Sequence, residues 1–187
     1  MNTFRAFIAI GLDDPTHQAL SEIQILLKKT GADVAWVKPN NAHLTLKFLG
    51  EISTEKIGPV AAAVESICHK KHFTAELTRL GAFPTVEHPQ IIWIGVEKGG
   101  DHIREIARDL EESLEKIGFK KEKRGFDPHV TLGRCRSSLN RFTLFKAMKD
   151  YPPRMISQEI RQIIFFKSTL APQGPVYEAI KIFPLVS

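Results

Sequence analysis

The segments HLTLKF (residues 43–48) and HVTLGR (residues 129–134) decide how this chain folds, because they repeat the pattern His-x-Thr-Leu 86 residues apart. The same order of elements precedes each copy. An apolar, strand-like run begins at Phe4 and another at Gln90, each 39 positions before its motif histidine. We therefore predict an internal duplication with a period of about 86 residues.

Helix patterns follow the first strand in both halves. Asp14 with Pro15 is typical of a helix start, and Asp101 marks a second start before an apolar stripe that ends at Gly118. Further helices are predicted at 53–69 and 139–149. Strands are predicted in HFTAELTRL (72–80), RMISQEIRQIIFF (154–166) and VYEAIKIF (176–183).

No linker rich in Gly or Ser separates the two halves. We therefore predict one α+β domain over residues 1–187 with two lobes, rather than two independent domains. A pseudo-twofold arrangement of the lobes would place the two motifs opposite each other across a cleft.

The composition is that of an ordinary globular protein, with 43% hydrophobic and 25% charged residues. The first apolar run is too short for a signal peptide, and no run reaches the roughly 18 residues of a membrane span. We therefore expect a cytoplasmic protein without membrane contact. Cys68 and Cys135 lack metal-type spacing and are interpreted as free thiols, while the net charge of +5 is compatible with a polyanionic partner.

Strict alternation along the motif strands predicts which side chains share a face. His43, Thr45 and Lys47 would share an exposed face, and Phe48 would lie on the core face with Leu44 and Leu46. In the second motif the exposed residues would be His129 and Thr131. Each motif thus presents an imidazole beside a hydroxyl.

Two histidines at one site are suited to concerted acid-base catalysis, because their ordinary pKa of about 6.5 allows one to accept a proton while the other donates one. This chemistry needs neither a metal nor another cofactor. Threonine hydroxyls can hold phosphate oxygens between the imidazoles. The residues therefore point to a phosphodiester substrate.

Arg134 could add a bidentate positive charge for a phosphate group. Strict alternation would turn it away from His129 and Thr131. Gly133 offers a solution, since glycine within a strand often marks a bulge that redirects its neighbours. We therefore include Arg134 among the candidate binding residues.

The paired motifs make the chain resemble the two-histidine (2H) phosphoesterase superfamily. The segments FRAFIAI (4–10), WVKPNNAHLTLKFLGE (36–51), FDPHVTLGR (126–134) and FFKSTLAPQGPVYE (165–178) are similar to the RNA 2',3'-cyclic phosphodiesterases, also named 2'-5' RNA ligases. The resemblance covers nearly the whole chain in the same order.

This resemblance implies a bilobal fold with one motif per lobe and a cleft for RNA that ends in a 2',3'-cyclic phosphate. It also implies hydrolysis to a 2'-phosphate without a metal, accompanied by a reversible 2'-5' joining activity. By position, His43 is the proton donor to the leaving 3' oxygen and His129 the proton acceptor that activates water. Thr45, Thr131 and Arg134 would bind the phosphate. No obligate protein partner is inferred.

Two other functions stay open: a cyclic phosphodiesterase for a small nucleotide or a 2'-5' linkage, and a non-catalytic module that binds RNA ends. The basic loop formed by Lys120, Lys121, Lys123 and Arg124 could guide RNA to the cleft or be a solvated loop. Trp36 and Trp93 are interpreted as packing residues. The remaining histidines are interpreted as structural, namely His17, His69, His72, His88 and His102.

Overall fold

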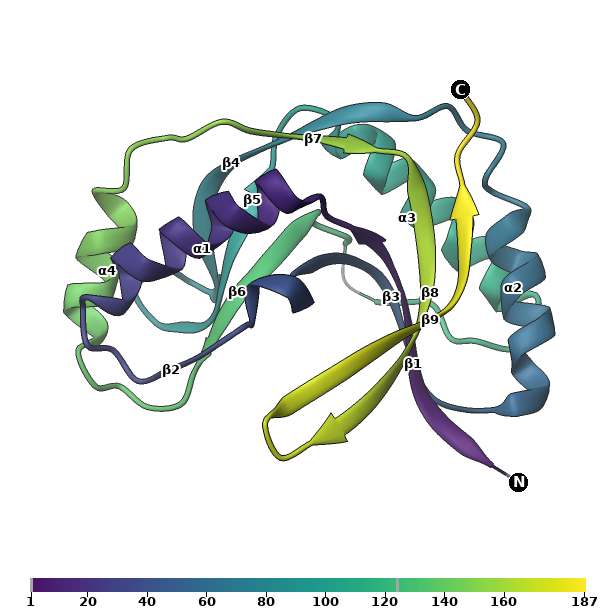
Figure 1. Cartoon of the computed structure of the whole chain (residues 1–187), viewed down its shortest axis with the longest axis horizontal. Helices are drawn as coiled ribbons and strands as arrows, with labels where there is room; N and C mark the ends of the chain where they lie inside the picture. Colours follow the sequence, from purple (N-terminus) through teal and green to yellow (C-terminus); the bar gives the residue numbers. More distant parts are fainter. Residues whose placement is uncertain (1, 124) are drawn as a thin grey trace.

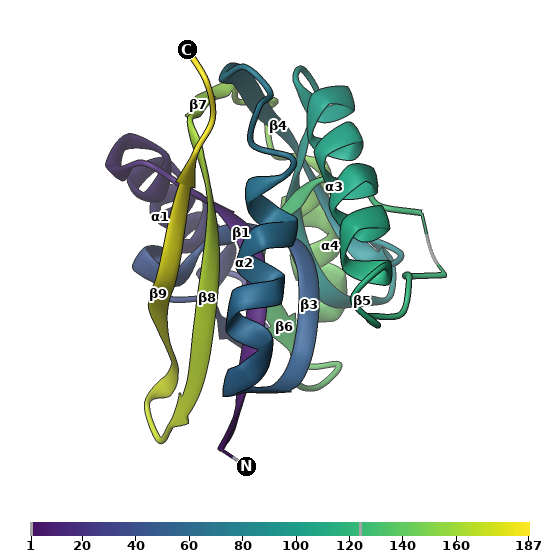
Figure 2. The ribbon, with the colours of Figure 1, turned by 90° about the vertical axis from the view of Figure 1, so that its right-hand side faces the viewer.

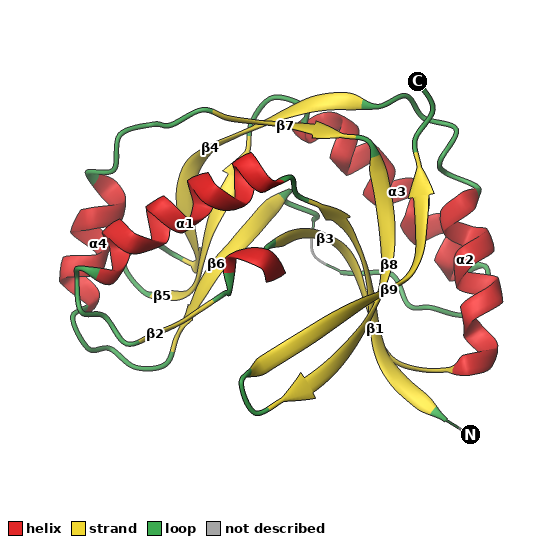
Figure 3. Cartoon of the chain, in the orientation of Figure 1, coloured by secondary structure: helices red, strands yellow, loops and turns green. Residues whose placement is uncertain are grey.

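The computed structural model describes residues 2–123 and 125–187, so the predicted role of Arg124 lies outside the described residues. The α+β fold class predicted from the sequence is confirmed, and Figures 1 and 3 show its helices and strands. The helices are α1 (Asp14–Lys28), α2 (Ile57–Glu65), α3 (Gly100–Glu115) and α4 (Arg141–Lys149). The strands are β1 (Thr3–Gly11), β2 (Val34–Trp36), β3 (His43–Ser53), β4 (Phe73–Pro84), β5 (Pro89–Val96), β6 (His129–Cys135), β7 (Ile156–Ile160), β8 (Gln162–Ala171) and β9 (Gly174–Pro184).

Short elements refine the predicted boundaries. A 3-10 turn, η1 (Pro39–Asn41), leads into β3, and a second one, η2 (Thr54–Lys56), precedes α2. The segment 154–166, predicted as one strand, is two, because the chain turns at Arg161 between β7 and β8. Among the described residues, no helix combines the length and apolar character needed to cross a membrane.

All strands join one curved antiparallel sheet in the order β7-β4-β5-β6-β3-β1-β8-β9, with β2 added beside β6. Figures 1 and 2 show how the sheet bends, so that β4, β5 and β6 form one half and β1, β3, β8 and β9 the other. The motif strands β3 and β6 are neighbours at the centre and pair at Leu44 and Val130. Each half of the sheet therefore carries one motif, and the two motifs are neighbours where the halves meet.

A helix from each half of the chain contacts the motif strand of the other half. Gln24 of α1 donates from Nε2 to the carbonyl oxygen of Leu132 in β6 at 2.9 Å. Glu111 of α3 pairs through Oε1 with Nζ of Lys47 in β3 at 2.7 Å. Through these two contacts, α1 packs against the half of the sheet that contains β6, and α3 packs against the half that contains β3.

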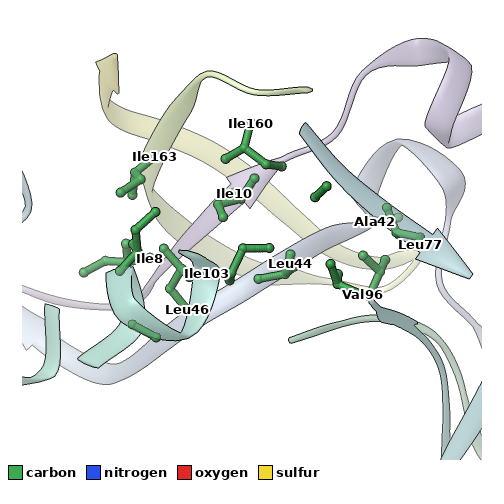
Figure 4. Packing of buried hydrophobic residues seen from close by; sticks show 14 of the residues in the cluster. Ile8, Ile10, Ala42, Leu44, Leu46, Leu77, Val96, Ile103, Ile160 and Ile163 are labelled. Carbon is green, nitrogen blue, oxygen red and sulfur yellow. The ribbon is translucent and has the colours of Figure 1, made fainter. Parts of the chain in front are cut away.

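The core lies between the helices and the sheet, where the apolar face of the motif strands is buried. Leu44 and Leu46 of β3 pack there with Ile8 and Ile10 of β1 and with Ile103 of α3 (Figure 4). Val130 and Leu132 of β6 are fully buried in the same cluster. Because these residues occupy the core face, His43, Thr45, His129 and Thr131 lie on the opposite face.

Both motif strands bulge directly after the motif threonine, which corrects the prediction from strict alternation. Leu46 is an extra residue in the pairing of β3 with β1, and Leu132 is the extra residue in the pairing of β6 with β5. Lys47 is therefore buried, with only 4% of its surface exposed, whereas Phe48 is 62% exposed. The predicted places of these two side chains were wrong because one added residue inverts the alternation.

Candidate functional site

The two motif histidines are anchored in the same way. Nδ1 of His43 donates to the carbonyl oxygen of Asn41 at 2.7 Å, and Nδ1 of His129 donates to that of Asp127 at 2.7 Å. A carbonyl oxygen can only accept, so Nδ1 carries the hydrogen in both rings. Each histidine therefore keeps Nε2 as the nitrogen that can exchange a proton with a substrate.

The pairing of Leu44 with Val130 sets the pattern of the four polar side chains. Continuing this antiparallel register by one residue in each direction places His43 opposite Thr131, and Thr45 opposite His129. The two hydroxyls therefore lie between the two imidazoles on one face of the sheet. The four polar side chains therefore form one cluster on this face of the sheet.

Aromatic side chains surround His43. The ring of Phe7 stacks on the imidazole with 4.8 Å between centroids, and Tyr177 of β9 meets it edge-on at 5.2 Å. Burial lowers the pKa of His43 below its ordinary value, and the hydrogen bond to Asn41 offsets only part of this effect. The neutral imidazole is therefore favoured in the free protein.

His129 has a different aromatic environment. Phe83 of β4 lies edge-on to its ring at 5.1 Å, and Trp93 of β5 lies 5.9 Å away between centroids. Trp93 is buried, as the sequence predicted for a packing residue. Aromatic side chains from β4 and β5 therefore lie beside the ring of His129.

A cleft of about 780 Å³ lies over the motif strands and includes His43, Thr45, Thr131 and Arg134 in its walls. His129 is not among the lining residues, although Thr131, two residues further along the same strand, is one of them. The cationic residues of the walls are Arg5, Lys38, Arg134 and Arg136, and no Asp or Glu of the described chain lines the cleft. The cleft is therefore suited to an anionic ligand.

Arg134 reaches the cleft through the bulge in β6. Leu132 and Gly133 are both buried, so the next side chain returns to the face of Thr131 and is exposed. A Cβ atom on Gly133 would lie 2.6 Å from Cγ1 of Val34, so only glycine permits β2 to pack this closely. The bulge that was predicted from Gly133 is therefore present in β6.

Several cleft residues were missed by sequence reasoning. Phe48 occupies the position in β3 that Arg134 occupies in β6, but Lys47 stands where β6 has Gly133, so no local glycine indicated the bulge. Phe7 and Tyr177 also line the cleft, although neither belongs to a motif. Trp36, predicted only to pack, lines the cleft as well and lies 6.0 Å from Nζ of Lys28.

The other candidate residues have contacts outside the cleft. Lys121 pairs with Glu115 at 2.8 Å, and the carbonyl oxygen of Lys120 accepts a bond from Nζ of Lys47 at 2.8 Å. Cys68 and Cys135 are free thiols, as predicted. The five remaining histidines do not line the cleft; their neighbours are Ala42 for His17, Ser66 for His69, Glu159 for His72, Arg141 for His88 and Phe73 for His102.

Comparisons with known proteins identify the family of this chain. The family model described as LigT like Phosphoesterase matches the chain twice, at residues 10–93 and 94–177. An RNA 2',3'-cyclic phosphodiesterase of Methanocaldococcus jannaschii is 33% identical over 178 residues, which cover 95% of this chain and 98% of the relative. The enzyme of the same name from Aeropyrum pernix is 33% identical over 162 residues, covering 86% and 92%.

Solved structures have the same fold. A protein of Thermus thermophilus superimposes with a TM-score of 0.82 at 25% identity, over 97% of both chains. LigT of E. coli, crystallised with 3'-AMP, superimposes with a TM-score of 0.80 at 24% identity over the whole of both chains. The repeated family match and the relatives of equal length together establish that this chain belongs to the LigT-like phosphoesterase family of the 2H superfamily.

Proposed function

We propose that this protein hydrolyses the 2',3'-cyclic phosphodiester at the end of an RNA to a 2'-phosphomonoester, with two histidines as acid and base and without a metal. The observation that carries the proposal is the pair of imidazoles whose Nδ1 atoms are both held by carbonyl oxygens. Both Nε2 atoms remain available, with two threonine hydroxyls between them. The relatives named RNA 2',3'-cyclic phosphodiesterase support the choice of substrate.

In the proposed mechanism the cyclic phosphate lies between the histidines, and Thr45 and Thr131 hold its oxygens. His129 takes a proton from water through Nε2 as the water attacks phosphorus. His43 gives a proton from Nε2 to O3' as the bond from phosphorus to O3' breaks. Arg134 contributes a charge-assisted contact to the phosphate. His43 lines the cleft that would hold the ribose, which supports its assignment as the donor.

The pKa of His43 predicts a difference between two pH profiles. Burial lowers this pKa in the free protein, but a bound phosphate anion stabilises the imidazolium and raises it. Since the donor must be protonated, kcat/KM should begin to fall with increasing pH below pH 6.5, and kcat should fall only at a higher pH. Both profiles are measured on one cyclic-phosphate oligonucleotide. Profiles that fall together would contradict a donor whose pKa depends on the bound phosphate.

Arg134 is expected to act mainly on substrate binding. Its guanidinium is exposed at the cleft wall and has no carboxylate partner among residues 2–123 and 125–187. Arg134→Ala should raise KM about tenfold or more, because a hydrogen bond to a charged group contributes roughly 1.5–3 kcal/mol. Arg134→Lys should recover part of the loss. Arg108→Ala, on α3 far from the cleft, is the control, and an equal effect of both alanine variants would exclude a specific contact.

Longer RNA is favoured over a single nucleotide by the charge of the cleft. Arg5, Lys38 and Arg136 lie beyond the four motif residues and could follow a phosphate backbone. Turnover of an oligonucleotide should therefore depend more strongly on salt than turnover of a nucleoside 2',3'-cyclic phosphate. Equal salt dependence would favour the small-nucleotide alternative.

We also infer that the chain is one bilobal domain, residues 1–187, that arose by internal duplication. The two family matches begin 84 residues apart, at 10 and 94, and the motif histidines are 86 residues apart. The paired bulges after Thr45 and Thr131 support the same symmetry.

The activity itself is tested with EDTA-treated protein and a short RNA that ends in a 2',3'-cyclic phosphate, across pH 6 to 8. Turnover is expected throughout this range. A cyclic phosphate that stays intact would contradict the proposal and favour a module that only binds RNA ends. In that case a variant with both His43→Ala and His129→Ala should keep most of its affinity for RNA.

A further inference from the structure

Gln24, in the second half of α1, is one of four polar side chains that are buried among the described residues. Only 2% of its surface is exposed. Its Nε2 lies 2.8 Å from the carbonyl oxygen of Val37 and 2.9 Å from that of Leu132. Carbonyl oxygens can only accept, so both hydrogens of the amide nitrogen are used in these two bonds. The proposed hydrolysis assigns no role to this side chain.

The amide of Gln24 lies beside β6 where one neighbouring strand ends and the next has not begun to pair. On this side of β6, β2 pairs with residues 133–135 and β3 pairs at Val130. Between β2 and β3 the chain leaves the sheet after Val37 and passes through η1, as Figure 1 shows. The backbone N–H of Val37 donates to the carbonyl oxygen of Leu132 at 2.9 Å. Gln24 therefore supplies the second donor to Leu132 and holds the departing chain through the carbonyl of Val37.

The carbonyl group that Gln24 holds belongs to the bulge of β6. Leu132 is the extra residue of this bulge in the pairing with β5. Its carbonyl is part of the peptide group that leads to Gly133, and Arg134 follows. Because of the bulge, Arg134 returns to the face of Thr131 and lines the cleft. An extra residue disturbs the regular pairing of a strand, so a donor from outside the sheet can decide the local shape of the backbone.

We propose that Gln24 is a positioning residue for Arg134. By bonding the carbonyls of Val37 and Leu132 from the helix side of the sheet, it fixes the bulge in the shape that directs the guanidinium into the cleft. Gln24 itself does not line the cleft, so it acts only through the backbone of β6. Since Arg134 binds a phosphate only in the proposed function, the role of Gln24 rests on that function.

Steady-state kinetics with a cyclic-phosphate oligonucleotide test this role. Gln24→Met keeps the length of the side chain and removes both donors. KM should rise about fivefold, less than for Arg134→Ala, because the guanidinium is displaced rather than removed. Since the carbonyl oxygens that hold Nδ1 of the two motif histidines belong to other residues, kcat should stay within about threefold. An unchanged KM, or a fall in kcat as large as the rise in KM, would overturn the proposal.

A double-mutant cycle distinguishes an effect through Arg134 from a general change in the cleft. In the background of Arg134→Ala, Gln24→Met should raise KM by less than a further factor of about two, because the guanidinium that it would displace is absent. Two increases in KM that multiply would contradict the proposal. The same cycle is measured without turnover, as the dissociation constant of adenosine 2'-phosphate in calorimetry. Failure of the proposed function would show as a lack of hydrolysis by the unchanged protein, whereas failure of the role of Gln24 would show as multiplying effects on binding.

Gln158→Met is the matched control, because Gln158 is a second buried glutamine that holds the other end of α1. It is 4% exposed, its Oε1 accepts from the backbone N–H of Asp13 at 2.9 Å, and its Nε2 donates to the carbonyl oxygen of Glu159 at 2.7 Å. The free energy of unfolding should fall about as much as for Gln24→Met, but KM should stay unchanged, since Gln158 contacts neither β6 nor the cleft. An equal rise in KM for both variants would assign the effect to the anchoring of α1 and overturn the proposal.

Gln24→Asn takes the place of Gln24→Met if urea denaturation shows that the methionine variant does not fold. Asparagine keeps a polar amide in the buried site but is one methylene shorter, so its nitrogen cannot reach both carbonyl oxygens. KM should again rise in the unchanged background and stay nearly constant in the background of Arg134→Ala. A KM equal to that of the unchanged protein would overturn the proposal.

Discussion

Replacing either motif histidine with alanine should lower kcat for cyclic-phosphate hydrolysis at least about a hundredfold, since a positioned general acid or base contributes roughly 10²–10⁴-fold. His43→Ala removes the proposed donor to O3', and His129→Ala removes the proposed acceptor from water. The measurement is kcat at saturating substrate, with circular dichroism to verify folding. The variant that lacks both side chains should be little slower than either single variant, because the two groups act in one step.

The control is His88→Ala. His88 is exposed and lies outside the cleft, with Nδ1 3.1 Å from Arg141. Its replacement should leave kcat unchanged. A single motif variant that keeps more than about a tenth of the activity would contradict paired acid-base catalysis.

Glu111→Ala should lower the free energy of unfolding by about 3 kcal/mol, the cost expected when one partner of a buried ion pair is removed. The side chain of Lys47 is only 3% exposed, and its Nζ lies 2.7 Å from Glu111. After the change this cation would keep the carbonyl oxygen of Lys120 and the more distant Glu122, which lies 3.6 Å away and is largely exposed. Urea denaturation measures the loss.

Two controls separate the buried charge from the loss of packing. Combining Glu111→Leu with Lys47→Met replaces the pair by apolar side chains and should recover most of the stability. Glu105 lies on the same helix as Glu111 and is an exposed partner of Lys70. Glu105→Ala should lower the free energy of unfolding by less than about 1 kcal/mol. Equal losses for Glu105→Ala and Glu111→Ala would contradict the account of Lys47.

The sequence predicted the side-chain positions of the first motif strand only in part. Alternation placed His43 and Thr45 on the correct face, because Leu44 and Leu46 mark the core side. It failed at Lys47 and Phe48, since a bulge depends on the pairing with β1, which lies outside the local pattern. A lysine on the core side was not expected because its partner Glu111 is 64 residues away in the chain.

The second motif was predicted more completely. Gly133 is a local indication of a bulge, and Arg134 accordingly reaches the cleft. The α+β class and the repeated order of elements were also accessible from apolar periodicity and helix caps. The exchange of α1 and α3 between the halves was not, because it depends on long-range contacts such as that of Gln24 with Leu132.

The aromatic residues around the histidines could not be predicted from local sequence patterns either. Phe7 and Tyr177 come from opposite ends of the chain, and only the pairing of β1 with β8 and of β8 with β9 brings them to His43. Their burial of the imidazole accounts for its lowered pKa. This feature therefore follows from the folded sheet rather than from the motif.

The central claim is that both histidines act on one cyclic phosphate and that the bond to O3' is the one that breaks. The most direct test is to identify the product of a short RNA 2',3'-cyclic phosphate by ³¹P NMR, with EDTA present, for the unchanged protein and for His43→Ala and His129→Ala. The account predicts a 2'-phosphate from the unchanged protein and almost no product from either variant. A 3'-phosphate, or a 2'-phosphate formed at an undiminished rate by either variant, would contradict it.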